Sequence, residues 1–154
     1  MIMIRFVKEE DQAFWHTLDP KLPLDQFLRK TRDRQGYVLF SDGVPCAILR
    51  YQLFWDEIPF LNLIKVSKEY RGQRLGLALL SQWEQDMLAL GFDMVMTSTQ
   101  SNEDAQTFYR RAGYRDAGCL VMDVPGHEQP TELLFTKKLL PGCACARKKD
   151  EAEG

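Results

Sequence analysis

Apolar and polar residues recur along the chain with two different periods, and these periods predict strands and helices. Apolar residues that alternate with polar ones, or run together between turn residues, indicate strands. In the first half this pattern predicts four strands, over residues 1–7, 37–40, 44–54 and 58–66. Apolar residues spaced by three or four positions predict helices over residues 9–18 and 23–34, with Gly36 as the C-terminal stop of the second helix.

Turn residues punctuate the strands of the first half. Ser41, Asp42 and Gly43 form a hairpin signal between two of these strands, and residues 55–57 form a second turn. A long helix then follows the strand over residues 58–66, and Gly91 is expected to end it. Its apolar residues lie at helical spacing, at Leu75, Leu79, Trp83, Met87 and Leu90.

The second half continues with a strand, a helix and two more strands. Residues 93–99 are mostly apolar and predict a strand buried on both faces. Ser101 and Asn102 are expected to cap a helix that extends to residue 112, and Gly113 is expected to close it. The last two strands are predicted over residues 114–121 and 132–138, on either side of a loop at residues 125–130.

The order of elements predicts the fold class. One strand is followed by two helices, three strands, a helix, a strand, a helix and two strands. This order suits an α/β (α+β) domain, with a mixed, twisted sheet covered by helices on both faces. Neither an internal repeat nor a second domain is evident in the sequence.

Length and composition limit the function classes. The chain has 154 residues, the size of one domain, which is expected over residues 1–140 with a flexible polar tail over residues 141–154. A net charge of −2 argues against broad binding of nucleic acid or membrane surfaces. Since no long apolar span is present and the N-terminus becomes charged too early for a signal peptide, a cytoplasmic location is expected. Both a monomer and a homodimer remain open.

The four cysteines do not predict a disulfide scaffold. Cys46 and Cys119 lie alone in strand-like runs and are expected to be small, buried apolar residues. Cys143 and Cys145 form a C-x-C pair in the tail, without a neighbouring histidine. A reduced, inert tail is favoured over metal or redox use, and no metal is expected.

A basic turn that contains glycine leads into the long helix. It reads RGQRLG over residues 71–76, and glycine there lets a ligand approach the main chain closely. Free N–H groups and the positive end of the helix dipole attract phosphate at such a position, and Arg71 and Arg74 add positive charge. An ordinary helix entry is the alternative. The common phosphate motifs GxxxxGK[ST] and GxGxxG are absent.

This turn resembles the acyl-CoA loop of the GCN5-related N-acetyltransferase (GNAT) family, which usually reads Q/R-x-x-G-x-G/A. Arg71 and Gly76 match that pattern, whereas Arg74 stands in place of the inner glycine. Arg74 fits only if its backbone N–H still points to the phosphate while its side chain turns outward. A register that starts at Gln73 and uses Gly76 and Ala78 also fits the pattern, although less well with the preceding turn.

A second stretch carries the same resemblance. Residues 102–114 read NEDAQTFYRRAGY, and the family typically has N-x-x-A…Y…G-F/Y at this place. The matching positions are Asn102, Ala105, Tyr109, Gly113 and Tyr114. Two motifs in the correct order, separated by a helix and a strand, are far more specific than either motif alone.

The resemblance implies a fold, a cosubstrate and a set of binding residues. The fold is a mixed, twisted, mostly antiparallel sheet of six to seven strands with helices on both faces. The cosubstrate is acetyl-CoA, and the partner is an amine acceptor. The expected acetyl-CoA contacts are Ile64, Val66, Arg71, Gly72, Gln73, Arg74, Leu75, Gly76, Asn102, Ala105 and Tyr109. Val66 is the expected backbone anchor of the acetyl carbonyl, and Asn102 could instead only cap its helix.

Tyr109 is the candidate general acid. Ala105 and Tyr109 are four residues apart and share one helix face, so a thin ligand could pass over the alanine and reach the phenol. Acetyl transfer to an amine releases the thiolate of CoA, and a phenol nearby can give it a proton. The alternative is that Tyr109 only packs, with its hydroxyl in water.

The general base and the acceptor are less well defined by the sequence. Asp56 and Glu57 lie at the start of a strand, where they could hold a cationic amine and relay its proton; the alternative is a pair of solvated turn residues. These carboxylates favour a small cationic amine as acceptor. Because no nucleophilic serine or cysteine motif appears, direct attack in a ternary complex is preferred.

Two functions therefore remain in view. The first is an acetyl-CoA-dependent N-acetyltransferase, which the intact Tyr109 motif favours. The second is a non-catalytic module that binds or senses acyl-CoA, which Arg74 in place of glycine favours. Nucleotide binding at the Arg71–Gly72 turn is disfavoured, because the sequence has neither a Lys-Ser/Thr pair nor an acid for magnesium beside that turn.

Overall fold

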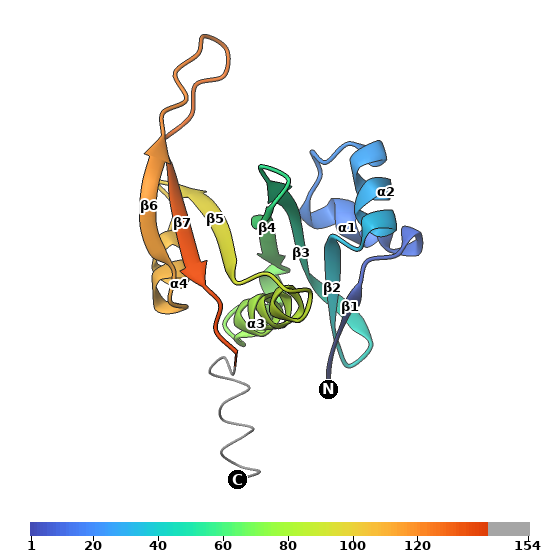
Figure 1. Ribbon diagram of the computed structural model, residues 1–154. Coiled ribbons are helices and arrows are strands. Elements are labelled where there is room, and N and C mark those ends of the chain that lie inside the picture. Colours follow the sequence, from blue (N-terminus) through green and yellow to red (C-terminus); the bar gives the residue numbers. More distant parts are fainter. Residues whose placement is uncertain (142–154) are drawn as a thin grey trace. The chain divides into compact units, whose positions relative to one another are not determined.

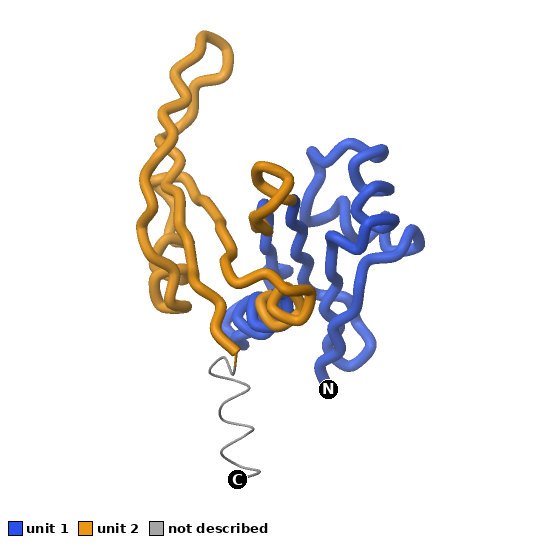
Figure 2. The backbone as a smooth tube through the Cα atoms, in the orientation of Figure 1, with its two compact units in different colours: residues 1–52, 62–83 blue, residues 53–61, 84–154 orange. Residues whose placement is uncertain are grey.

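The computed structural model describes residues 1–141, and the chain divides into two compact units. Unit 1 contains Met1–Gln52 and Asn62–Trp83, and unit 2 contains Leu53–Leu61 and the chain from Glu84 onward (Figure 2). The strand β4 and the helix α3 each contribute residues to both units. The tail with Cys143 and Cys145 lies outside the described residues.

Seven strands, four α-helices and two short 3-10 helices make up the described chain (Figure 1). In order they are β1 (Ile2–Phe6), η1 (Glu9–Asp11), α1 (Gln12–Leu18), α2 (Leu24–Asp33), β2 (Gly36–Ser41), β3 (Val44–Phe54), β4 (Ile58–Val66), η2 (Lys68–Tyr70), α3 (Leu75–Ala89), β5 (Met94–Gln100), α4 (Ala105–Arg111), β6 (Arg115–Leu120) and β7 (Glu132–Lys138). The predicted order of elements is confirmed, and β4 has the predicted bounds.

Hydrogen bonds link the strands in the order β1-β2-β3-β4-β5-β7-β6. The β4–β5 pair is parallel, whereas the β1–β2, β2–β3, β5–β7 and β6–β7 pairs are antiparallel. The parallel ladder consists of only two pairs, Phe60–Met96 and Leu61–Thr97. The predicted mixed, mostly antiparallel sheet is therefore confirmed.

The core of unit 1 lies on both faces of β2 and β3. On one face, Trp15 of α1 and Phe27 of α2 pack with Val38 and Ile48, and all four side chains are fully buried. Tyr51 of β3 packs instead against Trp83 of α3, with ring centroids 5.7 Å apart. Since neighbouring residues of a strand point to opposite faces, the run of buried residues along β3 requires helices on both sides.

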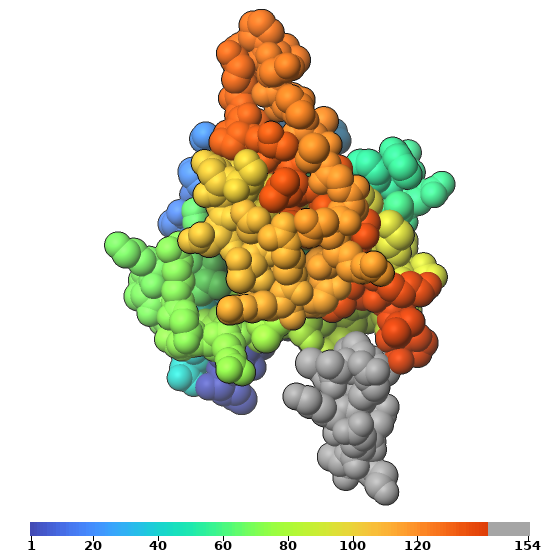
Figure 3. Space-filling model, turned by 90° about the vertical axis from the view of Figure 1, so that its left-hand side faces the viewer, coloured from blue at the N-terminus to red at the C-terminus, as the bar shows by residue number. Residues whose placement is uncertain are grey.

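The core of unit 2 is aromatic. Phe135 of β7 is fully buried, and the ring of Tyr109 of α4 lies 6.0 Å from it, centroid to centroid. Tyr114, at the start of β6, packs edge-on against Tyr109 at 5.5 Å. The connection between β6 and β7 projects beyond these strands (Figure 1), and its orange atoms form the projecting tip in Figure 3. The packing of Tyr109 on Phe135 holds helix α4 against strand β7.

Two predictions about helix ends are wrong, one for the C-terminus of α2 and one for the N-terminus of α4. Arg34, not Gly36, takes the left-handed position that ends α2, with φ of 55°. Gly36 begins β2, where a Cβ atom would come within 2.8 Å of a methyl carbon of Val7. Helix α4 starts at Ala105 with Asp104 as its N-cap, so Ser101 and Asn102 lie in a turn before the helix rather than at its cap.

One burial prediction is also wrong. Cys119 is exposed, because β6 is an edge strand whose residues all face solvent, whereas Cys46 is buried as expected. Leu90 is 68 % exposed, since α3 ends at Ala89 and the chain turns at Gly91. Gly91 has a φ of 99°, which confirms it as the stop of α3. Within residues 1–141, no helix combines the length and the apolarity needed to cross a membrane.

Gly36→Ala is expected to destabilise unit 1 by about 1–3 kcal/mol, because the new methyl group overpacks the site between Val7 and Trp15. Urea unfolding of the variant measures this change in the free energy of unfolding. Val7→Ala makes room for the methyl group, so the double variant should lose clearly less than the sum of the two single losses. Strict additivity would contradict the overpacking.

Candidate functional site

The loop between β4 and α3, in unit 1, contains most of the predicted acetyl-CoA contacts. Strand β4 ends at Val66, η2 follows, and α3 begins at Leu75. The Ser67 N–H donates to the Cys46 carbonyl oxygen at 2.8 Å, which fixes the chain where it leaves the strand. Leu75 is buried, whereas residues 71–74 are exposed. The loop is therefore anchored at both ends and open to solvent between them.

Two residues of this loop have left-handed backbones. Gly72 has a φ of 81° and Arg74 a φ of 61°. An added Cβ at Gly72 would meet nothing within 4 Å, so glycine is required there by conformation and not by space. A left-handed arginine costs about 1–2 kcal/mol. The chain thus keeps at Arg74 a backbone conformation that glycine adopts readily.

Donors gather where the loop enters α3. The Arg74 carbonyl oxygen accepts the N–H of Ala78 at 3.1 Å, so the helical hydrogen bonds start at Arg74. The N–H groups of the following turn have no partner within the helix, and the helix dipole adds positive potential there. Arg71 Nε donates to the Val66 carbonyl oxygen at 3.2 Å, which orients the guanidinium. This arrangement can bind an anionic group.

The other predicted contacts of unit 1 are in β4. Ile64 and Val66 are half-buried strand residues, and Gly76 is half-buried in the first turn of α3. Of the predicted residues in this unit, the structure joins Val66 and Arg71 by a direct hydrogen bond. Gln73 lies between the two left-handed residues and is exposed.

The second motif lies in unit 2, in the turn before α4 and in α4 itself. Asn102 is exposed in that turn, three residues before the first residue of the helix, and Asp104 is the N-cap. The turn is instead held by side chains: the Gln100 N–H donates to Glu103 Oε1 at 3.1 Å, and Gln106 Nε2 donates to the Ser101 carbonyl oxygen at 3.0 Å. Ala105 is half-buried at the first position of the helix.

Tyr109 is 4 % exposed and lies between the rings of Tyr114 and Phe135. Burial raises the pKa of its phenol, a side-chain hydrogen bond with Thr97 lowers the pKa, and the charge of Glu103 raises it; the net pKa lies above the ordinary value. The phenol is consequently protonated at neutral pH. It can serve as a proton donor.

A buried carboxylate supports the end of α4. Tyr114 donates its hydroxyl to Glu84 Oε2 at 2.8 Å, and Lys137 Nζ donates to Glu84 Oε1 at 2.7 Å. Lys137 Nζ also donates to the Ala112 carbonyl oxygen at 2.8 Å, at the C-terminus of the helix. Burial, followed by the charge of Glu84, raises the pKa of Tyr114 well above its usual value. These contacts hold the ring of Tyr114 against Tyr109.

Sequence reasoning missed Glu84, Lys137 and Thr97. One signal for Glu84 is present, because it lies four residues after Leu80 and three before Met87, on the buried face of α3. A carboxylate at such a position needs partners. The sequence does not identify these partners, since Lys137 lies 53 positions away.

The two candidate carboxylates for the base lie at the turn between β3 and β4. Asp56 and Glu57 are both exposed, and the Glu57 N–H donates to the Phe54 carbonyl oxygen at 3.0 Å. Trp55 and Asp56 have φ values of 54° and 59°. Trp55 is 74 % exposed, and its ring lies 4.6 Å from that of Phe54, centroid to centroid. A tryptophan in this conformation is a strained turn residue.

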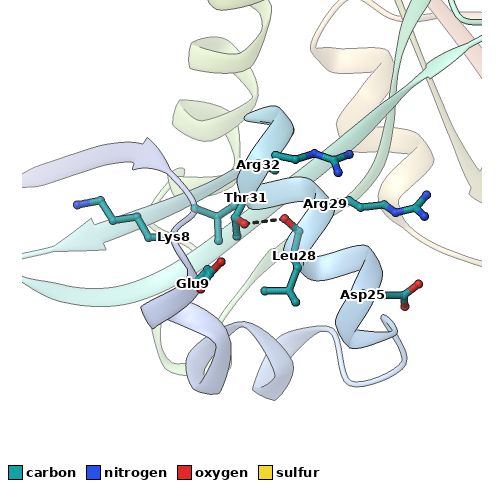
Figure 4. A pocket seen from close by; sticks show the side chains of 8 residues that line it. Lys8, Glu9, Asp25, Leu28, Arg29, Thr31 and Arg32 are labelled. Carbon is teal, nitrogen blue, oxygen red and sulfur yellow. Dashed lines mark hydrogen bonds between the residues drawn. The ribbon is translucent and has the colours of Figure 1, made fainter.

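A groove of about 700 Å³ opens in unit 1, next to α2, but contains none of the predicted residues. Figure 4 shows Lys8 and Glu9 on one side and Asp25, Arg29 and Arg32 on α2, with their side chains directed away from Lys8 and Glu9. The charged groups do not converge on a common point, so the groove is not a candidate active site.

In the described part of the chain, no group of three or more His, Cys, Asp or Glu residues could hold a metal ion.

Comparison with known protein families gives one clear match. The profile described as "Acetyltransferase (GNAT) family" matches residues 3–114, more than half of the chain. Both motifs, the loop before α3 and the helix α4, lie within this range. No curated protein sequence matches the chain.

Solved structures share the fold at low sequence identity. The ribosomal-protein-S18-alanine N-acetyltransferase from Escherichia coli superposes with a TM-score of 0.75 at 19 % identity, over 93 % of this chain and 97 % of that one. Ard1 from Thermoplasma volcanium gives 0.80 at 14 % identity, over 91 % and 99 % of the two chains. Arabidopsis thaliana Naa50, in complex with the bisubstrate analogue CoA-Ac-MVNAL, gives 0.76 at 14 %, over 88 % and 97 %.

Arg74→Gly is expected to stabilise the protein relative to Arg74→Ala by about 1 kcal/mol, because glycine adopts a left-handed φ without strain while alanine keeps the Cβ atom. Both variants remove the same charge, so the comparison isolates the backbone. Urea unfolding gives the two free energies. Equal stabilities would show that the left-handed backbone at this position carries no strain.

Proposed function

Since the chain belongs to the acetyltransferase (GNAT) family, we propose that it moves the acetyl group of acetyl-CoA to a primary amine by direct attack in a ternary complex. The observation that carries this proposal is the state of Tyr109. A buried, protonated phenol stands at the position where the family motif has its tyrosine. A non-catalytic module would not need such a donor, whereas a leaving thiolate does.

In this proposal the loop over residues 71–76 holds the diphosphate of acetyl-CoA. The exposed N–H groups around Gly72, Gln73 and Arg74 donate to phosphate oxygens, and the Arg71 guanidinium supplies a charge-assisted hydrogen bond. Leu75 and Gly76, in the first turn of α3, complete this part of the site. The left-handed backbone of Arg74 supports the proposal, because the loop keeps a glycine-like path despite the arginine.

The remaining proposed contacts to acetyl-CoA involve main-chain groups and small side chains. Ile64 and Val66 in β4 offer main-chain groups to the pantetheine arm, and the Val66 N–H is the proposed donor to the acetyl carbonyl oxygen. Ala105 leaves room beside α4 for that arm, and Asn102 supplies a polar contact from the preceding turn. Tyr109 gives its proton to the sulfur as the C–S bond breaks.

The acceptor is proposed to be a cationic amine. Asp56 and Glu57 expose two carboxylates at one turn, where they attract the amine and one of them accepts its proton before attack. A free protein N-terminus is an amine of the same charge. One structural neighbour is named as an N-acetyltransferase of a ribosomal-protein alanine. Spermidine and an unblocked peptide are therefore the first acceptors to test.

A non-catalytic acyl-CoA-binding module is the second candidate. The observation that favours it is the arginine side chain at residue 74, where the family has its inner glycine. Both candidates bind the cofactor, so binding and turnover must be measured separately.

Calorimetric titration with acetyl-CoA and with CoA is expected to give dissociation constants on the order of micromolar. Arg71→Ala should weaken both by about ten- to a hundredfold, since a charge-assisted hydrogen bond contributes about 1.5–3 kcal/mol. Arg29→Ala, an arginine of α2 in the same unit, is the matched control and should leave the affinity unchanged. Absence of binding by the unmodified chain would remove both candidate functions.

Tyr109→Phe is expected to lower kcat by about ten- to a thousandfold with little change in the affinity for CoA, because the phenyl ring keeps the packing and loses the proton. Release of free thiol from acetyl-CoA, with spermidine or the peptide as acceptor, measures the rate. Tyr70→Phe in η2 is the control for loss of a phenol. An unchanged kcat in Tyr109→Phe would remove the acid role.

A further inference from the structure

Thr97 of β5 is a polar residue in a fully buried position, and the reaction outlined above gives it no task. Its hydroxyl Oγ1 donates to the Leu61 carbonyl oxygen at 3.1 Å. Leu61 and Thr97 form the last of the two pairs in the parallel β4–β5 ladder. A side-chain hydroxyl thus satisfies a carbonyl at the point where the paired part of β4 ends, and this commits the single proton of the Thr97 hydroxyl.

The ladder also brings Thr97 under Tyr109. Thr97 lies directly opposite Phe135 in the antiparallel β5–β7 pair, so the two side chains are on the same face of the sheet. The ring of Tyr109 packs on Phe135 with centroids 6.0 Å apart, so the Thr97 hydroxyl lies on the sheet face that Tyr109 covers. A side-chain interaction with Thr97 lowers the pKa of the phenol, against the larger effect of burial. An interaction that lowers the pKa of a phenol stabilises the phenolate, so Thr97 acts on Tyr109 as a donor to its charged form.

We propose that the Thr97 hydroxyl is a two-position donor that positions Tyr109: it donates to the Leu61 carbonyl while the phenol is intact and to the phenolate after the proton has left. This inference rests on the proposed acid role of Tyr109. Thr97 is a positioning residue in this scheme, because it acts through Tyr109 and does not touch the reacting atoms.

In the proposed step the neutral amine attacks acetyl-CoA directly. The amine nitrogen forms a bond to the acetyl carbon, the C–S bond breaks, and the sulfur takes the proton of the Tyr109 hydroxyl. The products are the acetylated amine, CoA as the free thiol, a Tyr109 phenolate and one proton, which the amine nitrogen releases to solvent. Thr97 then turns its O–H from the Leu61 carbonyl to the phenolate oxygen, until a proton from solvent restores the phenol. The hydrogen bond stabilises the one charged state of Tyr109 that the step creates.

The surroundings of Tyr109 provide few other donors. Glu103, in the turn before α4, disfavours a phenolate by its negative charge. On the other side, Tyr114 contacts the ring while its own hydroxyl is committed to Glu84, which Lys137 also binds. Arg110 of α4 lies over the ring of Phe135, 5.5 Å from its centroid, and is bound to Asp116. Thr97 is the side chain placed to stabilise the phenolate by a hydrogen bond.

The test compares Thr97→Val, which removes the hydroxyl at nearly constant shape, with Thr97→Ser, which keeps it. In the thiol-release assay with acetyl-CoA and spermidine or the unblocked peptide, Thr97→Val is expected to lower kcat about tenfold with KM for acetyl-CoA within about twofold. Thr97→Ser is expected to retain kcat within about threefold of the unmodified enzyme. In the Tyr109→Phe background, Thr97→Val should have less than about a twofold effect.

A second measurement needs neither cosubstrate nor acceptor. The ¹³Cζ resonances of labelled tyrosines report ionisation, and the Tyr109 signal is the one missing from Tyr109→Phe. Since a hydrogen bond donated to the phenolate lowers the pKa, Thr97→Val should titrate Tyr109 at a higher pH than the unmodified chain, and Thr97→Ser should not. If Thr97→Val fails to fold, Thr97→Ala replaces it in both experiments.

The outcomes separate the two proposals. An equal loss of kcat by Thr97→Val in the presence and absence of the Tyr109 hydroxyl, or an unchanged Tyr109 titration, would overturn the two-position role while the acid role of Tyr109 stands. An unchanged kcat in Tyr109→Phe would instead remove the acid role, and the Thr97 inference with it. Coupled losses together with serine rescue support both.

Discussion

Burial of β2 and β3 on both faces is the constraint on which unit 1 depends. Trp15 and Phe27 fill one side of these strands, and the contact between Tyr51 and Trp83 secures α3 on the other. The N-terminus of α3 is thereby fixed, and the loop over residues 71–74 can remain exposed without losing its conformation. An anion site made of backbone donors needs this rigidity, because no side-chain rotamer can compensate for a misplaced N–H.

Unit 2 depends instead on hydrogen bonds to its buried polar groups. Glu84 receives two donors, from Tyr114 and Lys137, and Lys137 also binds the end of α4. Removing one partner from such a group leaves a buried charge or acceptor unpaired, which is costly. The position of Tyr109 therefore depends on polar contacts as well as on aromatic packing.

Much of the fold could be predicted from local signals in the sequence. The errors have a common cause, which is that contacts between side chains decide the outcome at those positions. The bounds of β4 and the stop of α3 at Gly91 follow from periodicity and turn chemistry within a few residues. The cap of α4 could not be predicted this way, because Glu103 and Gln106 hold the preceding turn. Gly36 is explained by its spatial neighbours Val7 and Trp15, which no helix-stop rule includes.

The candidate site likewise contains residues that local motifs indicate and residues that only distant contacts place there. Motif spacing is enough to select the loop and Tyr109, because both are local patterns. Thr97 could not be selected, since the role proposed for it depends on pairing with Leu61 and Phe135, which are distant in the sequence. Strain at Arg74 is visible only in the backbone angles.

The distribution of the three tryptophans gives the molecule a set of optical reporters. Trp15 and Trp83 are completely shielded in unit 1, whereas Trp55 is largely open to solvent at the β3–β4 turn of unit 2. Collisional quenchers such as iodide would reach Trp55 and spare the other two. Emission at longer wavelength then belongs to the turn that carries Asp56 and Glu57, and emission at shorter wavelength to the shielded core, so one spectrum follows the two regions separately.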